Sequence, residues 1–179
     1  MSAGHDGRVL IEAIRGDITT QDVDVVVNAA NSSLLGGGGV DGAIHAAAGP
    51  ELLAACRELR RTTLPDGLPV GEAVATPGFG LPARWVVHTV GPNRHAGQTD
   101  PALLASCFRR PLQLTAELGA STVAFPAVSA GVYGWDVEDV AEIAVRAVRG
   151  REEAGVELVR FVLFSQPALE AFRTALDAR

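Results

Sequence analysis

The sequence predicts an α/β fold, a three-layer α/β/α sandwich with a mixed, largely parallel sheet of about six strands. Two observations lead to this class. Short β-branched runs alternate with stretches of helical periodicity, which is typical of helices packed on a parallel or mixed sheet. Several runs are almost continuously apolar, for example residues 25–27 and 85–87, as expected of central strands covered on both faces. No repeat or low-complexity linker divides the 179 residues, so we expect residues 1–179 to form a single domain.

The expected strands are the β-branched runs at residues 9–14, 23–28, 72–76, 84–90, 122–126 and 158–164. A helix should begin at Asp100, a good N-cap that is followed by proline, and it should stop at Gly119. Pro111 lies inside this stretch and predicts a kink or break near Arg110, because proline cannot donate the helical hydrogen bond.

A further helix should follow Asp136, which is placed to cap it. Its apolar residues follow the helical i, i+3, i+4, i+7 rule at Val137, Val140, Ala141, Ala144, Val145 and Val148. The last helix is expected at about residues 168–177.

The composition excludes several classes of function. All 15 basic residues are arginine, which excludes Schiff-base enzymes, the phosphate-binding P-loop and kinase chemistry, since all of these need a lysine. The net charge of −6 argues against a nucleic-acid surface. Cys56 and Cys107 have no CxxC spacing and are expected to be small buried hydrophobes. The first residues lack a signal-peptide pattern and no run is long enough to span a membrane, so we expect a cytoplasmic protein without membrane partners.

A run of four glycines, Gly36 to Gly39, is the first candidate site. Glycines leave backbone N–H groups bare, and this run leads into a helix whose positive end favours an anion. The run is flanked by Asn31 and Asp41, which favours a ligand loop over the alternative of a flexible surface turn. A second loop rich in small residues, residues 126–134, lies between a strand and a helix. Two such loops at one sheet edge would suit a diphosphate.

Three other motifs are weighed and set aside. The spacing of Gly37, Gly39 and Gly42 fits the dinucleotide fingerprint, but it begins too far from the preceding strand. Ser129 resembles a nucleophile elbow, yet all four histidines precede it and the first glycine is missing. No histidine pair has the spacing of zinc ligands, so no metal site is expected.

Three single residues have a plain structural alternative. His88, inside an apolar strand, is more often a hydrogen-bonded core residue than a ligand. His45, on the helix after the glycines, is likewise expected to be structural. Asp17 would by default be a helix cap or form an Asx-turn, and its alternative role is to accept the amino group of a base.

These segments together resemble macro domains of the MacroD type. The resemblance runs from about Ile11 to the last helix and rests, in chain order, on residues 16–19 (GDIT), 28–31 (NAAN), the glycine run, 40–45 (VDGAIH), 81–84 (LPAR), 88–92 (HTVGP) and 125–134 (FPAVSAGVYG). Three positions depart from the family pattern: Ala46, Val70 and the pair Trp135-Asp136. The last lies close to the second loop and could alter how that loop closes.

The resemblance implies an ADP-ribose pocket and a hydrolase that needs no cofactor. The family removes mono-ADP-ribose from acidic side chains of proteins and deacetylates O-acetyl-ADP-ribose, so ADP-ribose and mono-ADP-ribosylated proteins are the implied partners. Carried over by position, Asp17 would accept the adenine amino group beside Ile18, and Phe164 would cover the adenine. The loop residues implied to bind the phosphates and the distal ribose are Gly38, Gly39, Val40, Ser129, Ala130, Gly131, Val132 and Tyr133.

Asn31 and Asp41 are the expected catalytic pair. Ester hydrolysis needs an aligned water, a group that orients or deprotonates it, and donors for the developing negative charge. Asp41 can hold the water and Asn31 can orient the ribose hydroxyls, although a phosphate of the substrate could orient the water instead. The alternatives are a module that binds ADP-ribose without hydrolysing its esters and, more remotely, a nicotinamide oxidoreductase.

Overall fold

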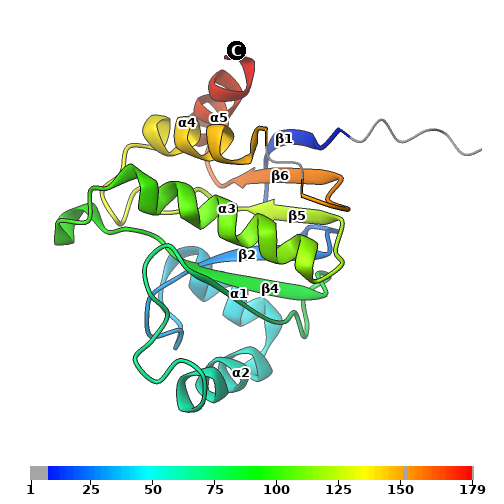
Figure 1. The fold of residues 1–179 in the computed structure, drawn as a ribbon, viewed down its shortest axis with the longest axis vertical. Coiled ribbons are helices and arrows are strands. Elements are labelled where there is room, and N and C mark those ends of the chain that lie inside the picture. Colours follow the sequence, from blue (N-terminus) through cyan, green and yellow to red (C-terminus); the bar gives the residue numbers. More distant parts are fainter. Residues whose placement is uncertain (1–7, 151–152, 179) are drawn as a thin grey trace, which may run out of the picture.

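In the computed structural model, residues 8–150 and 153–178 form a six-stranded mixed sheet with helices on both faces (Figure 1). The strand order is β1-β6-β5-β2-β4-β3, and all neighbouring strands are parallel except the antiparallel pair β3 and β4. The strands are β1 (Leu10–Arg15), β2 (Val25–Ala30), β3 (Ala73–Pro77), β4 (Trp85–Val90), β5 (Thr122–Phe125) and β6 (Leu158–Leu163). The predicted sandwich and all six strands are confirmed, with ends that differ from the predicted ones by at most two residues.

The helices form two layers. Helices α1 (Gly39–Ala48) and α2 (Pro50–Arg61) cover one face of the sheet, and α3 (Pro101–Glu117), α4 (Val137–Val148) and α5 (Gln166–Asp177) cover the other. Two short 3-10 helices, η1 (Ile18–Thr20) and η2 (Arg94–Ala96), complete the elements.

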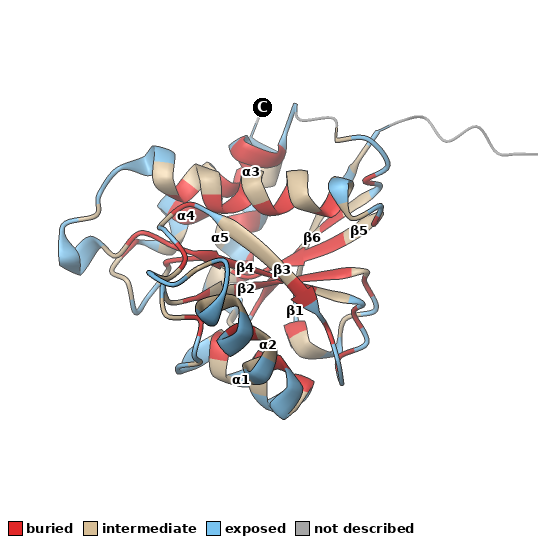
Figure 2. Cartoon of the chain, turned by 60° about the horizontal axis from the view of Figure 1, so that its bottom comes forward, coloured by how far each residue is buried: buried red, intermediate tan, exposed pale blue. Residues whose placement is uncertain are grey.

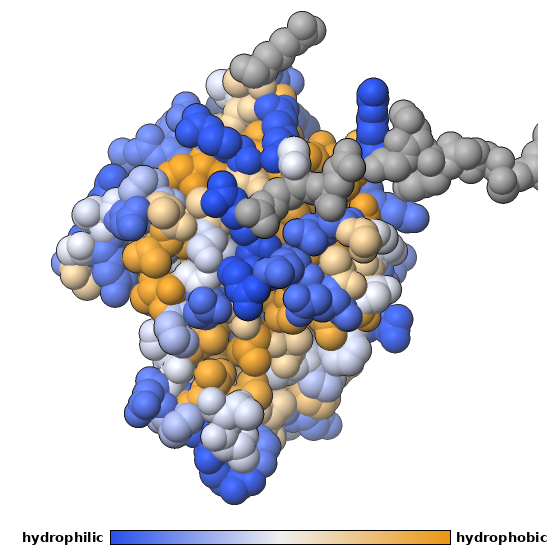
Figure 3. Space-filling view, in the orientation of Figure 1, coloured by the Kyte–Doolittle hydropathy of each residue, from blue (hydrophilic) through white to orange (hydrophobic). Residues whose placement is uncertain are grey.

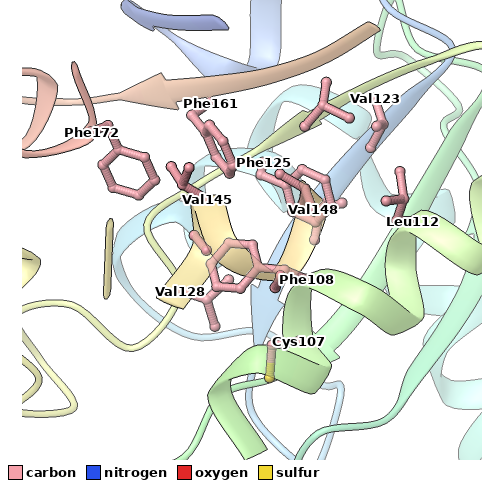
Figure 4. Close-up of a cluster of buried hydrophobic side chains, with 14 of the residues drawn as sticks. Cys107, Phe108, Leu112, Val123, Phe125, Val128, Val145, Val148, Phe161 and Phe172 are labelled. Atoms are coloured by element: carbon pink, nitrogen blue, oxygen red, sulfur yellow. The ribbon is translucent and has the colours of Figure 1, made fainter. Parts of the chain in front are cut away.

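The alternation of side chains along the strands separates two apolar cores. In β2, Val25 and Val27 face α3 to α5, whereas Val26 faces α1 and α2. Both faces of β2 are buried, as Figure 2 shows for the centre of the sheet, and its first half is accordingly apolar. The larger core holds a chain of ring contacts between Phe108, Phe125, Phe161 and Phe172, with centroids 4.9 to 6.2 Å apart (Figure 4).

Helix α3 corrects one prediction. It continues as one helix through Pro111, so the break expected near Arg110 does not occur. The apolar face of the helix, with Leu104, Phe108 and Leu112, is buried against the sheet and α4. Burial of three such side chains contributes roughly 5–9 kcal/mol, which exceeds the ~3 kcal/mol that an internal proline costs a helix.

The helix ends agree with the predictions in one case and differ in another. Asp100 caps α3, because its Oδ1 accepts from the backbone N–H of Ala102 at 2.9 Å. Asp136 is the N-cap residue of α4, but its side chain makes no capping hydrogen bond.

The predicted core cysteines, Cys56 and Cys107, are both buried and unpaired. None of the helices in the described ranges is long and apolar enough to cross a membrane. On the face seen in Figure 3, apolar residues form patches interrupted by hydrophilic ones.

Candidate active site

The carboxyl ends of the five parallel strands lie at one edge of the sheet and bring the predicted site residues together. Along this edge, the strand order places the turn after β1 beside the end of β6, then the loop after β5, then the loop after β2. The N–H of Gly16 donates to the carbonyl of Leu163 at 3.0 Å, which ties the ends of β1 and β6 together. Residues far apart in the sequence are therefore arranged in a row, with Asp17 near one end and Asp41 near the other.

The glycine loop presents an open backbone. A Cβ added at Gly36, Gly38 or Gly39 would have no other atom within 4 Å. Gly38 is the N-cap of α1, and as a glycine it has no side chain that could cap this helix end. The first N–H groups of α1 are therefore free to bind an anion, which the helix dipole also favours. Gly42 has the opposite role, since a Cβ there would lie 2.7 Å from the carbonyl oxygen of Gly37 and would push the loop away.

Asn31 and Asp41 converge at Gly37. The position of a Cβ on this glycine would be 3.1 Å from Oδ2 of Asp41 and 3.4 Å from Nδ2 of Asn31. Asn31 holds the loop in place, because its Nδ2 donates to the carbonyl of Gly36 at 2.9 Å and its Oδ1 accepts from Ser33 Oγ at 2.5 Å. One N–H of the Asn31 amide remains for a ligand.

The Asp41 carboxylate is almost fully buried and has two polar neighbours that the sequence analysis did not assign to the site. Its Oδ1 accepts from Asn28 Nδ2 at 2.8 Å and lies 3.4 Å from His45 Nε2, while the side chain is 7% exposed. Among the described residues, no group hydrogen-bonds to Oδ2, so this oxygen is available. The sequence signals were the four-residue spacing of Asp41 and His45 on one helix face and the asparagine three residues before Asn31.

The two histidines differ. His88 is fully buried and hydrogen-bonded, as predicted. Burial, aided by the nearby charge of His45, lowers the pKa of His88 to about 3, so its ring is neutral at ordinary pH. His45, which is expected to be structural, has its Nε2 3.4 Å from Oδ1 of Asp41.

The loop after β5 is built on the neighbouring β4–α3 connection. Ser129 has a left-handed backbone with φ of 68°, and its Oγ donates to the carbonyl of Pro92 at 2.9 Å. The hydroxyl is thereby turned to the protein, which leaves mainly the backbone of residues 129–133 for a ligand. Ala130 and Trp135 form an isolated bridge that closes the loop, and Val132 at its tip is 83% exposed.

Trp135, one of the departures from the family pattern, is buried beneath Arg94, and its indole Nε1 has no hydrogen-bond partner among the described residues. The Arg94 guanidinium lies 4.5 Å from the centre of the buried Trp135 indole. The backbone N–H of Arg94 donates to the carbonyl of Tyr133 at 2.8 Å. The segment around η2 therefore fixes the closing end of this loop from outside.

The other end of the row holds Asp17, Ile18 and Phe164. Oδ1 of Asp17 accepts from both N and Oγ1 of Thr19 at 2.8 and 2.6 Å, and these bonds lower the pKa of the Asp17 carboxyl. Asp17 is therefore an N-cap, as its default interpretation predicted, with Oδ2 left over. Ile18 is buried, whereas Phe164 is 93% exposed at the end of β6. An aromatic ring so exposed is available to cover a flat ligand.

A hollow of about 470 Å³ lies beside the glycine loop, between α1 and α2. Most of its lining is apolar, and it shares part of the glycine loop and His45 with the site: the lining residues are Leu35, Gly36, Gly37, Gly42, His45, Ala46, Gly49, Pro50 and Leu53. In the described ranges, no cluster of three or more histidine, cysteine or acidic side chains could hold a metal ion.

The fold and this edge define an α/β domain in which two loops with exposed backbone lie along one sheet edge together with polar and aromatic side chains. The family model of the Macro domain matches residues 27–144, and the chain belongs to this family. A macro domain-containing protein of Streptomyces griseus is 58% identical over 95% of this chain and 96% of its own. A protein of Klebsiella pneumoniae named O-acetyl-ADP-ribose deacetylase is 49% identical over 92% of this chain and 95% of its own.

Solved structures agree with the family assignment. A macrodomain of Oceanobacillus iheyensis with ADP superposes with a TM-score of 0.87 at 46% identity, covering 92% of this chain and 88% of the other. A Trypanosoma brucei macrodomain in complex with ADP-ribose gives a TM-score of 0.82 at 36% identity, covering 93% of this chain and 68% of that one. The chain is thus similar to proteins that hold an adenosine diphosphate group.

Proposed function

We propose that this macro domain binds ADP-ribose and hydrolyses its esters, removing mono-ADP-ribose from acidic side chains of proteins and deacetylating O-acetyl-ADP-ribose. The observation that carries the proposal is the convergence of Asn31 and Asp41 at the open glycine loop. The Klebsiella relative supports the deacetylase activity by its name, and the Trypanosoma brucei complex supports the ligand.

The row of groups along the sheet edge suits the parts of ADP-ribose in order. Asp17 and Phe164 take the adenine at one end, through the free Oδ2 of the carboxylate and the exposed ring. The diphosphate lies between the glycine loop and residues 129–133, whose backbone N–H groups bind its oxygens. The distal ribose then reaches Asn31 and Asp41.

The carboxylate supplies the chemistry. A water held by Oδ2 of Asp41 attacks the ester, Asp41 takes up its proton, and the products are ADP-ribose and a carboxylic acid. Asn28 occupies Oδ1, which leaves Oδ2 for the water. The remaining N–H of Asn31 and the loop amides stabilise the developing negative charge. The partners implied by this function are mono-ADP-ribosylated proteins in the cytoplasm.

The proposal is tested with a glutamate-linked ADP-ribosylated protein and O-acetyl-ADP-ribose as substrates. We expect Asp41→Ala and Asp41→Asn to lower the rate by roughly 10² to 10⁴-fold while the Kd for ADP-ribose changes by less than about tenfold. The asparagine variant keeps an oxygen for Asn28, so it separates loss of the base from loss of packing.

The matched control is Asp177→Ala, which removes an exposed carboxylate at the end of α5. It should leave both the rate and the Kd unchanged. Equal rates for the wild type and both Asp41 variants would remove Asp41 from the mechanism. Tight ADP-ribose binding without turnover by the wild type would instead show a module that only binds the nucleotide.

A further inference from the structure

A chain of buried polar contacts runs from β3 through the sheet to the Asp41 carboxylate. Asn28 on β2 and His88 on β4 are register partners, and Thr76 on β3 lies on the same face of the sheet. The distances are 2.8 Å from Asn28 Nδ2 to Asp41 Oδ1, 3.1 Å from Asn28 Nδ2 to His88 Nδ1, and 2.9 Å from His88 Nε2 to Thr76 Oγ1. Each of these four residues is buried, so no bulk water replaces a lost contact.

The carboxylate determines the direction of every hydrogen bond in this chain. Since it can only accept, Asn28 must direct its amide N–H₂ to Asp41. The second hydrogen of the same nitrogen then points to Nδ1 of His88, so Nδ1 must be the unprotonated ring atom. The neutral ring carries its proton on Nε2 and donates it to Thr76.

Asn28 has nothing else to hold its orientation. Its Oδ1 is buried and, within the described part of the chain, has no hydrogen-bond partner. The amide is therefore kept in place by its two acceptors alone, Asp41 and His88. If His88 lost its acceptor at Nδ1, only the single hydrogen bond to Asp41 would hold the amide, and its plane could tilt or rotate about that bond.

We propose that His88, a neutral Nε2–H ring hydrogen-bonded to Thr76, is a positioning residue that fixes the Asn28 amide and through it the Asp41 carboxylate. The inference rests on the proposed function, because it concerns the orientation of the catalytic carboxylate. Neither His88 nor Thr76 touches the ligand edge, so the effect acts on turnover and leaves ADP-ribose affinity unchanged. Because burial lowers the pKa of His88 to about 3, the ring stays neutral and keeps this arrangement between pH 5 and 8.

The first test does not depend on activity. Long-range ¹H–¹⁵N NMR spectra of the wild type distinguish the two neutral tautomers, and His88 is assigned by its loss in His88→Gln. We expect a neutral Nε2–H ring that does not titrate between pH 5 and 8. A ring protonated on Nδ1, or one that titrates in this range, would overturn the proposal even if the enzyme activity is present.

The second test compares kcat, ADP-ribose Kd and Tm among four variants. His88→Gln keeps a group near Thr76 but loses the acceptor for Asn28, and its kcat should fall about tenfold or more. His88→Asn can place its carbonyl near the position of Nδ1 and should retain more of kcat. Thr76→Val should also lower kcat, because it removes the oxygen that accepts the Nε2 proton and leaves the ring with the distant Cys56 Sγ at 3.9 Å.

Thr115→Val is the matched control. Thr115 is also fully buried, and its hydroxyl donates only to the carbonyl of Pro111 within α3. It should lower Tm to a similar extent as Thr76→Val with no change in kcat. Equal kcat values for Thr76→Val and Thr115→Val, or loss of kcat and affinity together, would contradict a positioning role. An inactive wild type that still shows the Nε2–H ring would refute the proposed hydrolysis and leave the geometry of the chain intact.

Discussion

The glycine loop makes the sharpest prediction, because Gly38 can be replaced without strain. Its φ of −93° and ψ of −172° are open to any residue, and a Cβ there would meet no atom within 4 Å. Gly38→Glu should therefore fold normally and place a carboxylate in front of the α1 N-terminus. Two unit charges on the order of 5 Å apart repel by about 3 kcal/mol at an effective dielectric constant of about 20, which corresponds to a loss of more than about 100-fold in affinity.

Calorimetric titration with ADP-ribose measures this loss, and Gly38→Gln is the control of equal size. Gly38→Gln should bind at least about tenfold more tightly than Gly38→Glu, and the difference should shrink at high salt as the charges are screened. Wild-type affinity in Gly38→Glu would refute the placement of the diphosphate at this loop. Equal weakening in both variants would refute the electrostatic reasoning.

Two further predictions concern the adenine end and the buried histidine. Phe164→Ala should weaken ADP-ribose binding roughly tenfold, the size of one base–aromatic stacking contact, without changing the free energy of unfolding. The control is Leu10→Ala, also exposed but at the amino ends of the strands, which should change neither the Kd nor the free energy of unfolding. Equal Kd values for both variants would remove Phe164 from the site. Because the folded pKa of His88 is lowered to about 3, the unfolded chain takes up this proton first as the pH falls, and stability is lost below pH 6.5. The free energy of unfolding, measured with denaturant between pH 6 and 4, should therefore fall less steeply with decreasing pH in His88→Gln than in the wild type, by up to about 1.4 kcal/mol per pH unit. Equal slopes of this free energy against pH would contradict a neutral buried His88.

The sequence was sufficient for the fold because local patterns and packing agree. Every β-branched run became a strand, and the alternation within β2 explains how one apolar segment serves two cores. Pro111 is the exception, since the burial of the apolar face of α3 outweighs a local preference. Asp136 reaches the N-cap position by sequence spacing alone, and spacing does not determine whether its side chain turns to the helix.

The site was predictable where it is local in sequence. The glycine loop and the ten-residue spacing of Asn31 and Asp41 could be recognised directly, and the structure brings the two side chains together. The contact between Asn28 and His88 could not, because it joins residues 60 positions apart and depends on the register of β2 and β4. The contact of His45 with Asp41 is local, since the two residues lie four positions apart on α1.

The most direct test of the whole account is a crystal structure of this protein with ADP-ribose bound. We expect the diphosphate between residues 36–39 and 129–133, with the distal ribose within hydrogen-bond distance of the Asp41 carboxylate. A nucleotide seated in the hollow between α1 and α2, or a distal ribose remote from Asp41, would contradict the proposed site and its chemistry.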